Sequence, residues 1–165
     1  ALPHGEATDK IIENGELVTI DFGYYVDDYT SDVTRTIAIG SISDDLKQIY
    51  AIVKQANENA IAIVKPGISG SEVDRVARDY ISAHGYGHDY NHSTGHGVGL
   101  DIHEGPALSS QSSDELQPGH LLTIEPGIYL AEQGGVRIED DIIVTLDGYE
   151  NLTNDLTKDL IVIEG

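Results

Sequence analysis

The order of the secondary-structure patterns along the chain constrains its fold most strongly. Residues 17–25 and 29–39 are rich in β-branched and aromatic side chains, which are typical of strands. Asp27 and Asp28 separate the two runs and suit a tight turn. The first part of the chain is therefore predicted to form a long β-hairpin.

Two helices are predicted next. Apolar residues recur at helical spacing over roughly 44–64, after the N-cap candidate Ser43, and again near 72–83, after the N-cap candidate Ser71. Further strands are predicted at 121–125, 136–139 and 142–145. A hairpin, two helices and then more strands indicate an α+β fold with an antiparallel sheet.

Composition excludes several classes of function. The 165 residues include 29 acidic and 9 basic side chains, and the formal net charge of -20 argues against nucleic acid and anionic membranes as partners. There is no cysteine, so disulfides and thiolate metal sites are excluded. No apolar run approaches the roughly 20 residues of a membrane span, and no signal peptide is visible, so we expect a cytoplasmic protein.

Histidine and glycine are concentrated between residues 92 and 106. His92, His96 and His103 lie there, three of the seven histidines of the chain, and glycines alternate around His96. Imidazole binds metals and exchanges protons near neutral pH, and glycine lets the backbone approach a ligand closely. A glycine-rich loop with surface histidines is the simpler alternative, so the run needs support from other residues.

Two aspartates of the hairpin supply part of that support. If Asp27 and Asp28 are the central turn residues, Asp21 faces Thr34 and Asp32 faces Gly23, so both carboxylates share one face. Gly23 is expected to leave open space opposite Asp32. Two carboxylates in one gap repel each other unless a cation lies between them. The alternatives are a solvent-facing pair, or a turn of odd length that would put the two on opposite faces.

Two glutamates complete a candidate ligand set. Glu125 and Glu139 each end an apolar strand-like run near Gly or Pro features that could open a cavity, although such carboxylates are often only rim residues. One imidazole, His96, with four carboxylates favours hard or borderline ions such as manganese, cobalt or zinc. Four carboxylates carry more charge than one divalent ion neutralises, so two ions are expected. A calcium-binding EF-hand is excluded by the missing loop Gly and Glu, and a serine nucleophile elbow is absent.

With these residues in view, the chain resembles the creatinase/prolidase, or pita-bread, metallopeptidase family, most closely its Xaa-Pro dipeptidase and Xaa-Pro aminopeptidase branch. Four motifs carry the resemblance across nearly the whole chain. They are Asp21-Phe22-Gly23 with Ser31-Asp32-Val33-Thr34-Arg35-Thr36, the run from His92 to Glu104, Thr123-Ile124-Glu125-Pro126-Gly127-Ile128-Tyr129, and Gly135-Val136-Arg137-Ile138-Glu139-Asp140.

The resemblance implies a role for each matching residue. Two divalent ions, with Mn2+ preferred and Co2+ or Zn2+ possible, would be bound by Asp21, Asp32, His96, Glu125 and Glu139, with Asp32 and Glu139 bridging both. Substrate or transition state would be contacted by His4, His92 and His103, and the cluster oriented by Tyr129 and Arg137, which we include among the substrate-binding candidates.

The expected reaction is hydrolysis of the bond between an N-terminal residue and proline. The metals would activate water, Glu125 would transfer the proton, His103 would stabilise the oxyanion, and His92 is the third catalytic candidate. Alternatives are a methionine aminopeptidase-like or creatinase-like hydrolase and a non-catalytic pita-bread binding module. Two bound metals per chain would argue against the binding module.

The resemblance also implies that residues 1–165 are part of a larger catalytic domain. The family's catalytic domains carry further helices and a strand before the segment that matches Leu2-Pro3-His4-Gly5, often after a separate N-terminal domain. The chain also contains no methionine. We therefore expect a fragment, incomplete at the N-terminus, that exposes apolar surface when alone and belongs to a homodimeric full-length protein.

Overall fold

The computed structural model describes residues 1–164, and its first feature is the long β-ribbon. The ribbon consists of β1 (Leu17–Phe22) paired with β4 (Val33–Ile39), extended by β2 (Tyr25–Val26) and β3 (Tyr29–Thr30). Asp27 and Asp28 form the turn with positive φ angles of 50° and 70°, as in the hairpin turns that match strand twist. Asp21 pairs with Thr34, so the predicted register is confirmed.

The ribbon is interrupted where two continuous strands were predicted, and Gly23 explains part of the break. A Cβ atom at Gly23 would lie 1.9 Å from the Ser31 carbonyl oxygen, so only glycine allows the two backbones to pass this closely. The expectation of open space opposite Asp32 is therefore wrong, because the backbone of Ser31 fills it.

The two predicted helices are present as α1 (Asp44–Ala62) and α2 (Gly70–Ala83). The Ser43 side chain accepts a hydrogen bond from the Leu46 amide, as an N-cap should. For α2 the predicted cap Ser71 is wrong. Ser69 is the N-cap and forms a capping box with Glu72, because the serine–glutamate spacing of three residues satisfies two free amides at once.

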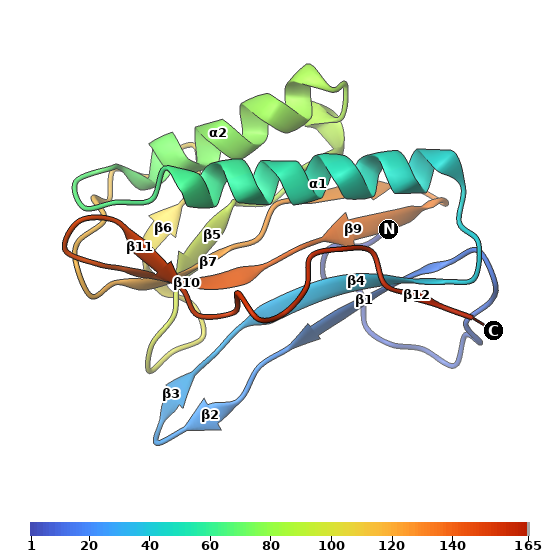
Figure 1. Ribbon diagram of the computed structural model, residues 1–165, viewed down its shortest axis with the longest axis horizontal. Helices are drawn as coiled ribbons and strands as arrows, with labels where there is room; N and C mark the ends of the chain where they lie inside the picture. Colours follow the sequence, from blue (N-terminus) through green and yellow to red (C-terminus); the bar gives the residue numbers. More distant parts are fainter. Residues whose placement is uncertain (165) are drawn as a thin grey trace.

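Both helices lie on the same side of the sheets, and the core lies between these layers (Figure 1). α1 packs its apolar face against the strands, with Ile49 and Val53 fully buried, and α2 contributes Val73 and Ile81. The opposite side of the sheets is thereby left for the polar side chains of the site. Within residues 1–164, neither helix is long and apolar enough to cross a membrane.

The second half of the chain builds a five-stranded sheet in the order β11-β10-β7-β5-β6. Its strands are β5 (Gly95–Gly97), β6 (Glu104–Leu108), β7 (Leu121–Ile124), β10 (Asp140–Val144) and β11 (Tyr149–Asn151). The other strands are the hairpin pair β8 (Gly127–Leu130) and β9 (Gly134–Arg137), and β12 (Val162–Ile163), and a short 3-10 helix spans Gly87–Asp89.

Strands β6, β8, β11 and β12 were not predicted from the sequence. These strands are two to five residues long and lack a clear alternation, so their pairing depends on neighbours that are distant in sequence. β12 pairs with β4 in parallel, whereas the other strand pairs described are antiparallel, as expected.

Apolar side chains are exposed along the first ribbon, as expected. Ile20 and Phe22 of β1 are 42% and 43% exposed, and Tyr25, Val26 and Tyr29 near the tip are more exposed still. β1 is also an edge strand, since its sheet has the order β1-β4-β12.

Candidate metal centre

The first two candidate ligands lie on one side of the ribbon. Asp21 is part of β1, and Asp32 immediately precedes β4. Oxygen atoms of Asp21, Asp32 and Glu139 lie within 4.8 Å of one another, although Asp21 and Glu139 are far apart in sequence. The ribbon therefore points both aspartates to the same place, as the even-length turn predicted.

The glycines on either side of His96 allow its strand to fit between two others. A Cβ atom at Gly95 would lie 1.9 Å from the Thr123 carbonyl oxygen, and one at Gly97 would lie 2.2 Å from the Gly105 carbonyl oxygen. These glycines were expected to let the backbone approach a ligand, but the close approach is to neighbouring strands. β5 is thus held tightly, and the His96 side chain projects from a fixed backbone.

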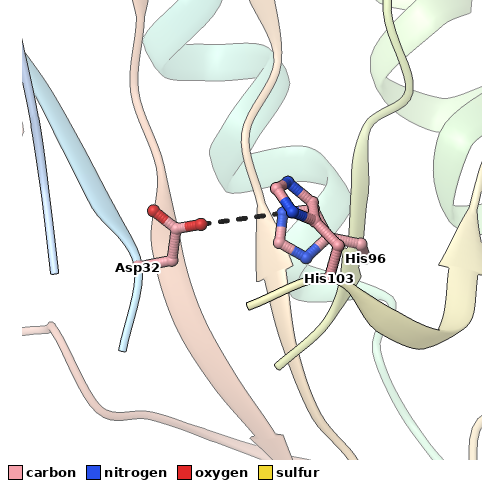
Figure 2. Close-up of side chains that lie close together, drawn as sticks. All are labelled: Asp32, His96 and His103. Carbon is pink, nitrogen blue, oxygen red and sulfur yellow. Dashed lines mark ion pairs between the residues drawn. The ribbon is translucent and has the colours of Figure 1, made fainter. Parts of the chain in front are cut away.

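The His96 ring is oriented by its own strand. Its Nδ1 atom is 3.0 Å from the Gly97 carbonyl oxygen, which can only accept, so Nδ1 carries the proton. Nε2 is left as an acceptor and lies 3.7 Å from Asp32 Oδ2 and 3.4 Å from Glu125 Oε1. Figure 2 shows Asp32 pointing at the His96 ring, with His103 beside it at a ring-centroid separation of 4.2 Å.

The two glutamates come from the strands that continue the sheet. Glu125 follows β7, and Glu139 lies between β9 and β10 with only 2% of its surface exposed. Thr34 of β4 binds Glu139 twice: its hydroxyl donates to Glu139 Oε2 over 2.5 Å, and its carbonyl accepts from the Glu139 amide. This pair joins the first ribbon to the second sheet at the centre of the site.

Among residues 1–164, three overlapping groups of side chains have donor atoms close enough to share an ion. They are Asp21, Asp32 and Glu139; His96, Glu125 and Glu139; and Asp32, His96 and His103. All five predicted ligands are included, and Asp32, His96 and Glu139 each belong to two groups. Nitrogen and carboxylate oxygen donors without sulfur suit hard or borderline divalent ions.

The electrostatics of the cluster also fit a bound cation. Burial, reinforced by the charge of Asp21, raises the pKa of Asp32 to about 6. Burial, with the nearby charges of Asp32 and Asp21, raises the pKa of Glu125 to about 7, and burial beside Glu125 holds the pKa of Glu139 well above its ordinary value. Carboxylates that oppose one another's ionisation in this way are stabilised when a cation lies between them.

Arg137 joins ligand and substrate candidates across the site. Its Nη2 donates to Asp21 Oδ2, its Nε donates to the Thr34 hydroxyl over 3.2 Å, and its Nη1 donates to the Pro3 carbonyl over 2.7 Å. The last contact holds the segment that carries His4. A single buried guanidinium thus orients both the candidate ligand Asp21 and the N-terminal segment around Pro3 and His4.

His92 is held by hydrogen bonds on both ring nitrogens. Nδ1 lies 2.8 Å from the Ser93 carbonyl oxygen and must donate to it, so Nε2 accepts from the Tyr129 hydroxyl at 2.9 Å. Tyr129 in turn accepts from Arg137 over 3.1 Å. Burial lowers the pKa of His92 to about 4, so its ring is neutral at pH 7.

These residues surround one cavity of about 260 Å³. The cavity is lined by Asp21, Asp32, His96, Glu125, Glu139, His4, His92, His103, Arg137, Ser93 and Ile102. Tyr129 lies outside the lining and behind His92, which makes it a support for that ring. Ser93, Ile102 and Thr34 were not singled out from the sequence, although the hairpin register had already placed Thr34 opposite Asp21.

Comparison with known proteins identifies the family. Residues 1–146 match the sequence profile of metallopeptidase family M24. The chain belongs to this family. Membership implies divalent metal ions, which fit the donor set described above.

M24 relatives of this chain include proteins named for activity on Xaa-Pro peptides. The chain is 51% identical over 153 residues to the Xaa-Pro dipeptidase of Pyrococcus horikoshii, covering 93% of this chain and 44% of that protein. It superimposes on the Xaa-Pro dipeptidase from Bacillus anthracis with a TM-score of 0.96 at 53% identity, over 98% of this chain and 45% of that one.

A second solved structure carries a different name. The X-Pro aminopeptidase from Thermotoga maritima superimposes with a TM-score of 0.94 at 44% identity, over 98% of this chain and 46% of that chain. The predicted α+β pita-bread fold of the creatinase/prolidase branch is confirmed by these likenesses. The chain spans somewhat less than half the length of these relatives.

Proposed function

We propose that the full-length protein is a dinuclear metal-dependent exopeptidase that hydrolyses the bond between an N-terminal residue and proline. The observation that supports this proposal is the convergence of one imidazole and four carboxylates, from five separate places in the fold, on one small cavity. Relatives about half identical to this chain, and named Xaa-Pro dipeptidase, support the substrate class.

Two divalent ions would be held by the five candidate ligands Asp21, Asp32, His96, Glu125 and Glu139, with Asp32 and Glu139 shared between them. We favour Mn2+, and Co2+ or Zn2+ also suit a site with one imidazole and several carboxylates. When bound, such ions polarise the scissile carbonyl and lower the pKa of a water molecule.

The remaining steps belong to side chains of this chain. Glu125 accepts the proton of the attacking water at its carboxylate and returns it to the leaving proline nitrogen. His103, beside His96, donates to the developing oxyanion, and the neutral His92 ring lines the same cavity and contacts the substrate there. His4 binds the substrate from the N-terminal segment that lines the cavity, where Arg137 holds the backbone at Pro3.

The proposal is tested by replacing the proton carrier. Glu125→Gln in the full-length protein removes the carboxylate with little change in shape, and we expect turnover of Xaa-Pro dipeptides and tripeptides with Mn2+ to fall at least about 100-fold. Glu132→Gln, at an exposed turn, is the matched control and should leave turnover unchanged. Wild-type turnover in Glu125→Gln, or fewer than two metals per wild-type chain, would contradict the proposal.

Comparing the two substrates distinguishes the two activities: a dipeptidase hydrolyses the Xaa-Pro dipeptides, whereas an aminopeptidase also hydrolyses the tripeptides. A cytoplasmic location and a homodimer of the full-length protein are further parts of the proposal. Cell fractionation and light scattering of the full-length protein test these two points.

A further inference from the structure

A buried carboxylate of α2 has no part in the metal cluster. Asp74 has 1% of its side chain exposed, yet it lies on the helix that covers the far side of the sheet. It accepts four hydrogen bonds: from Arg78 Nε and Nη2, both at 2.8 Å, and from the Thr94 amide and hydroxyl at 3.2 and 2.9 Å. Burying an ion pair adds little to the stability of the fold, because the loss of hydration offsets the attraction between the charges. Stability alone therefore does not explain why Asp74 and Arg78 are paired here.

Arg78 extends this pair to the loop that leads into the site. Its Nη1 donates to the Tyr90 carbonyl over 3.2 Å, and its Nη2 donates to the His92 carbonyl over 2.9 Å. The guanidinium also lies 4.3 Å from the centroid of the Tyr90 ring. One planar group therefore binds a helix carboxylate and two loop carbonyls, which a flexible ammonium group cannot reproduce in full.

The loop is held on the other side of His92 as well. The Thr94 hydroxyl must donate to Asp74, because a carboxylate only accepts, so the Tyr90 hydroxyl donates to Thr94 over 2.6 Å. The Thr94 carbonyl accepts from the Glu125 amide over 2.7 Å. The main chain is thus anchored before and after His92, and the second anchor reaches the backbone of a ligand.

We propose that Asp74 and Arg78 are positioning residues: Arg78 holds the His92 ring in the cavity through the main chain of its loop, and Asp74 aligns Glu125 through Thr94. The proposal rests on the proposed function. Misplacing a side chain at the reacting centre by about 1 Å can cost on the order of 100-fold in rate, so an anchor of this kind affects catalysis without touching substrate.

The test uses Arg78→Met in the full-length protein, which keeps the apolar stem and removes the hydrogen-bonding group. We expect kcat/KM for an Xaa-Pro dipeptide to fall about tenfold, with two metals still bound and with partial recovery in Arg78→Lys. Arg75→Met, one turn earlier on an exposed position of α2, is the matched control and should keep wild-type kcat/KM. Wild-type kcat/KM in Arg78→Met overturns the proposal.

A double-mutant cycle separates positioning from general support of the fold. If Arg78 acts through His92, Arg78→Met should change kcat/KM by less than about twofold once His92 is replaced by alanine. Equal losses in both backgrounds overturn the role proposed for Arg78. If Arg78→Met does not fold, Arg78→Lys is used in the same cycle with the same two outcomes.

A measurement without turnover keeps the two proposals apart. The nitrogen resonances of the His92 ring should shift in Arg78→Met and stay in place in Arg75→Met, whatever reaction the enzyme catalyses. Unshifted resonances in Arg78→Met overturn the positioning role alone, whereas an inactive wild-type protein with shifted resonances contradicts only the proposed function.

Discussion

Thr34 lies where the first ribbon meets the second sheet, and one hydroxyl serves two neighbours there. It donates to Glu139 and accepts from Arg137, so it aligns a candidate ligand and the guanidinium that holds Asp21. Partners of this kind orient ligands and raise metal affinity, although they do not bind the ion themselves.

Replacing Thr34 by valine keeps the shape and removes the hydroxyl. We expect metal affinity to fall about 10- to 100-fold, because Glu139 loses its donor and Arg137 loses an acceptor. Titration of the metal-free protein with Mn2+ in a calorimeter measures the change. Thr19→Val, at an exposed threonine of β1, is the control, and equal affinities in the two variants would argue against the role given to Thr34.

α2 shows how a local sequence signal determines where an element begins. Two serines, Ser69 and Ser71, are candidates for the cap, and only Ser69 has glutamate three residues later. The reciprocal bonds of Ser69 and Glu72 satisfy amides that the first helical turn leaves free. The correct start could therefore have been read from the sequence by giving the serine–glutamate spacing more weight.

Ser69→Ala should lower the free energy of unfolding by about 1 kcal/mol, the usual cost of losing an N-cap. Ser71→Ala should cost clearly less, because this serine is inside the helix. Urea unfolding followed by circular dichroism measures both variants. A larger loss for Ser71→Ala would contradict the assignment of the cap.

For the whole molecule, the buried carboxylates make the metal-free protein sensitive to pH. The pKa of Glu125 is about 7 in the fold against an ordinary 4.5, so the folded state binds a proton that the unfolded state has released. Its contribution to stability is present at low pH and is lost as pH rises through about 7. Glu139 acts in the same direction, and above pH 6.5 the lowered pKa of His92 no longer opposes them.

The metal-free protein should therefore melt at a lower temperature at pH 8 than at pH 6.5. Saturating Mn2+ should raise the melting temperature more at pH 8, because no proton has to be displaced there. Calorimetric scans with chelator and with Mn2+ at the two pH values measure both effects. A metal-free protein that melts at the same or a higher temperature at pH 8 would contradict the electrostatic account of the site.

The sequence by itself determined the local features of this protein. The paired aspartates at the turn predicted the register that puts Asp21 opposite Thr34, and apolar spacing predicted both helices within a few residues. The motifs around Asp21, His96, Glu125 and Glu139 could also be recognised in the sequence. In each case the signal lies within a short stretch of chain.

Only the tertiary structure decided what depends on packing between distant segments. Gly95 and Gly97 allow close contact between strands, and the Ser31 carbonyl, rather than empty space, lies beside Gly23. In the anchoring of His92, Arg78 donates to the main-chain carbonyls of Tyr90 and His92, and Asp74 accepts from the Thr94 amide. These main-chain groups have no side-chain signature in the sequence. Such contacts depend on where the backbone runs, and the backbone path is set by the whole core at once.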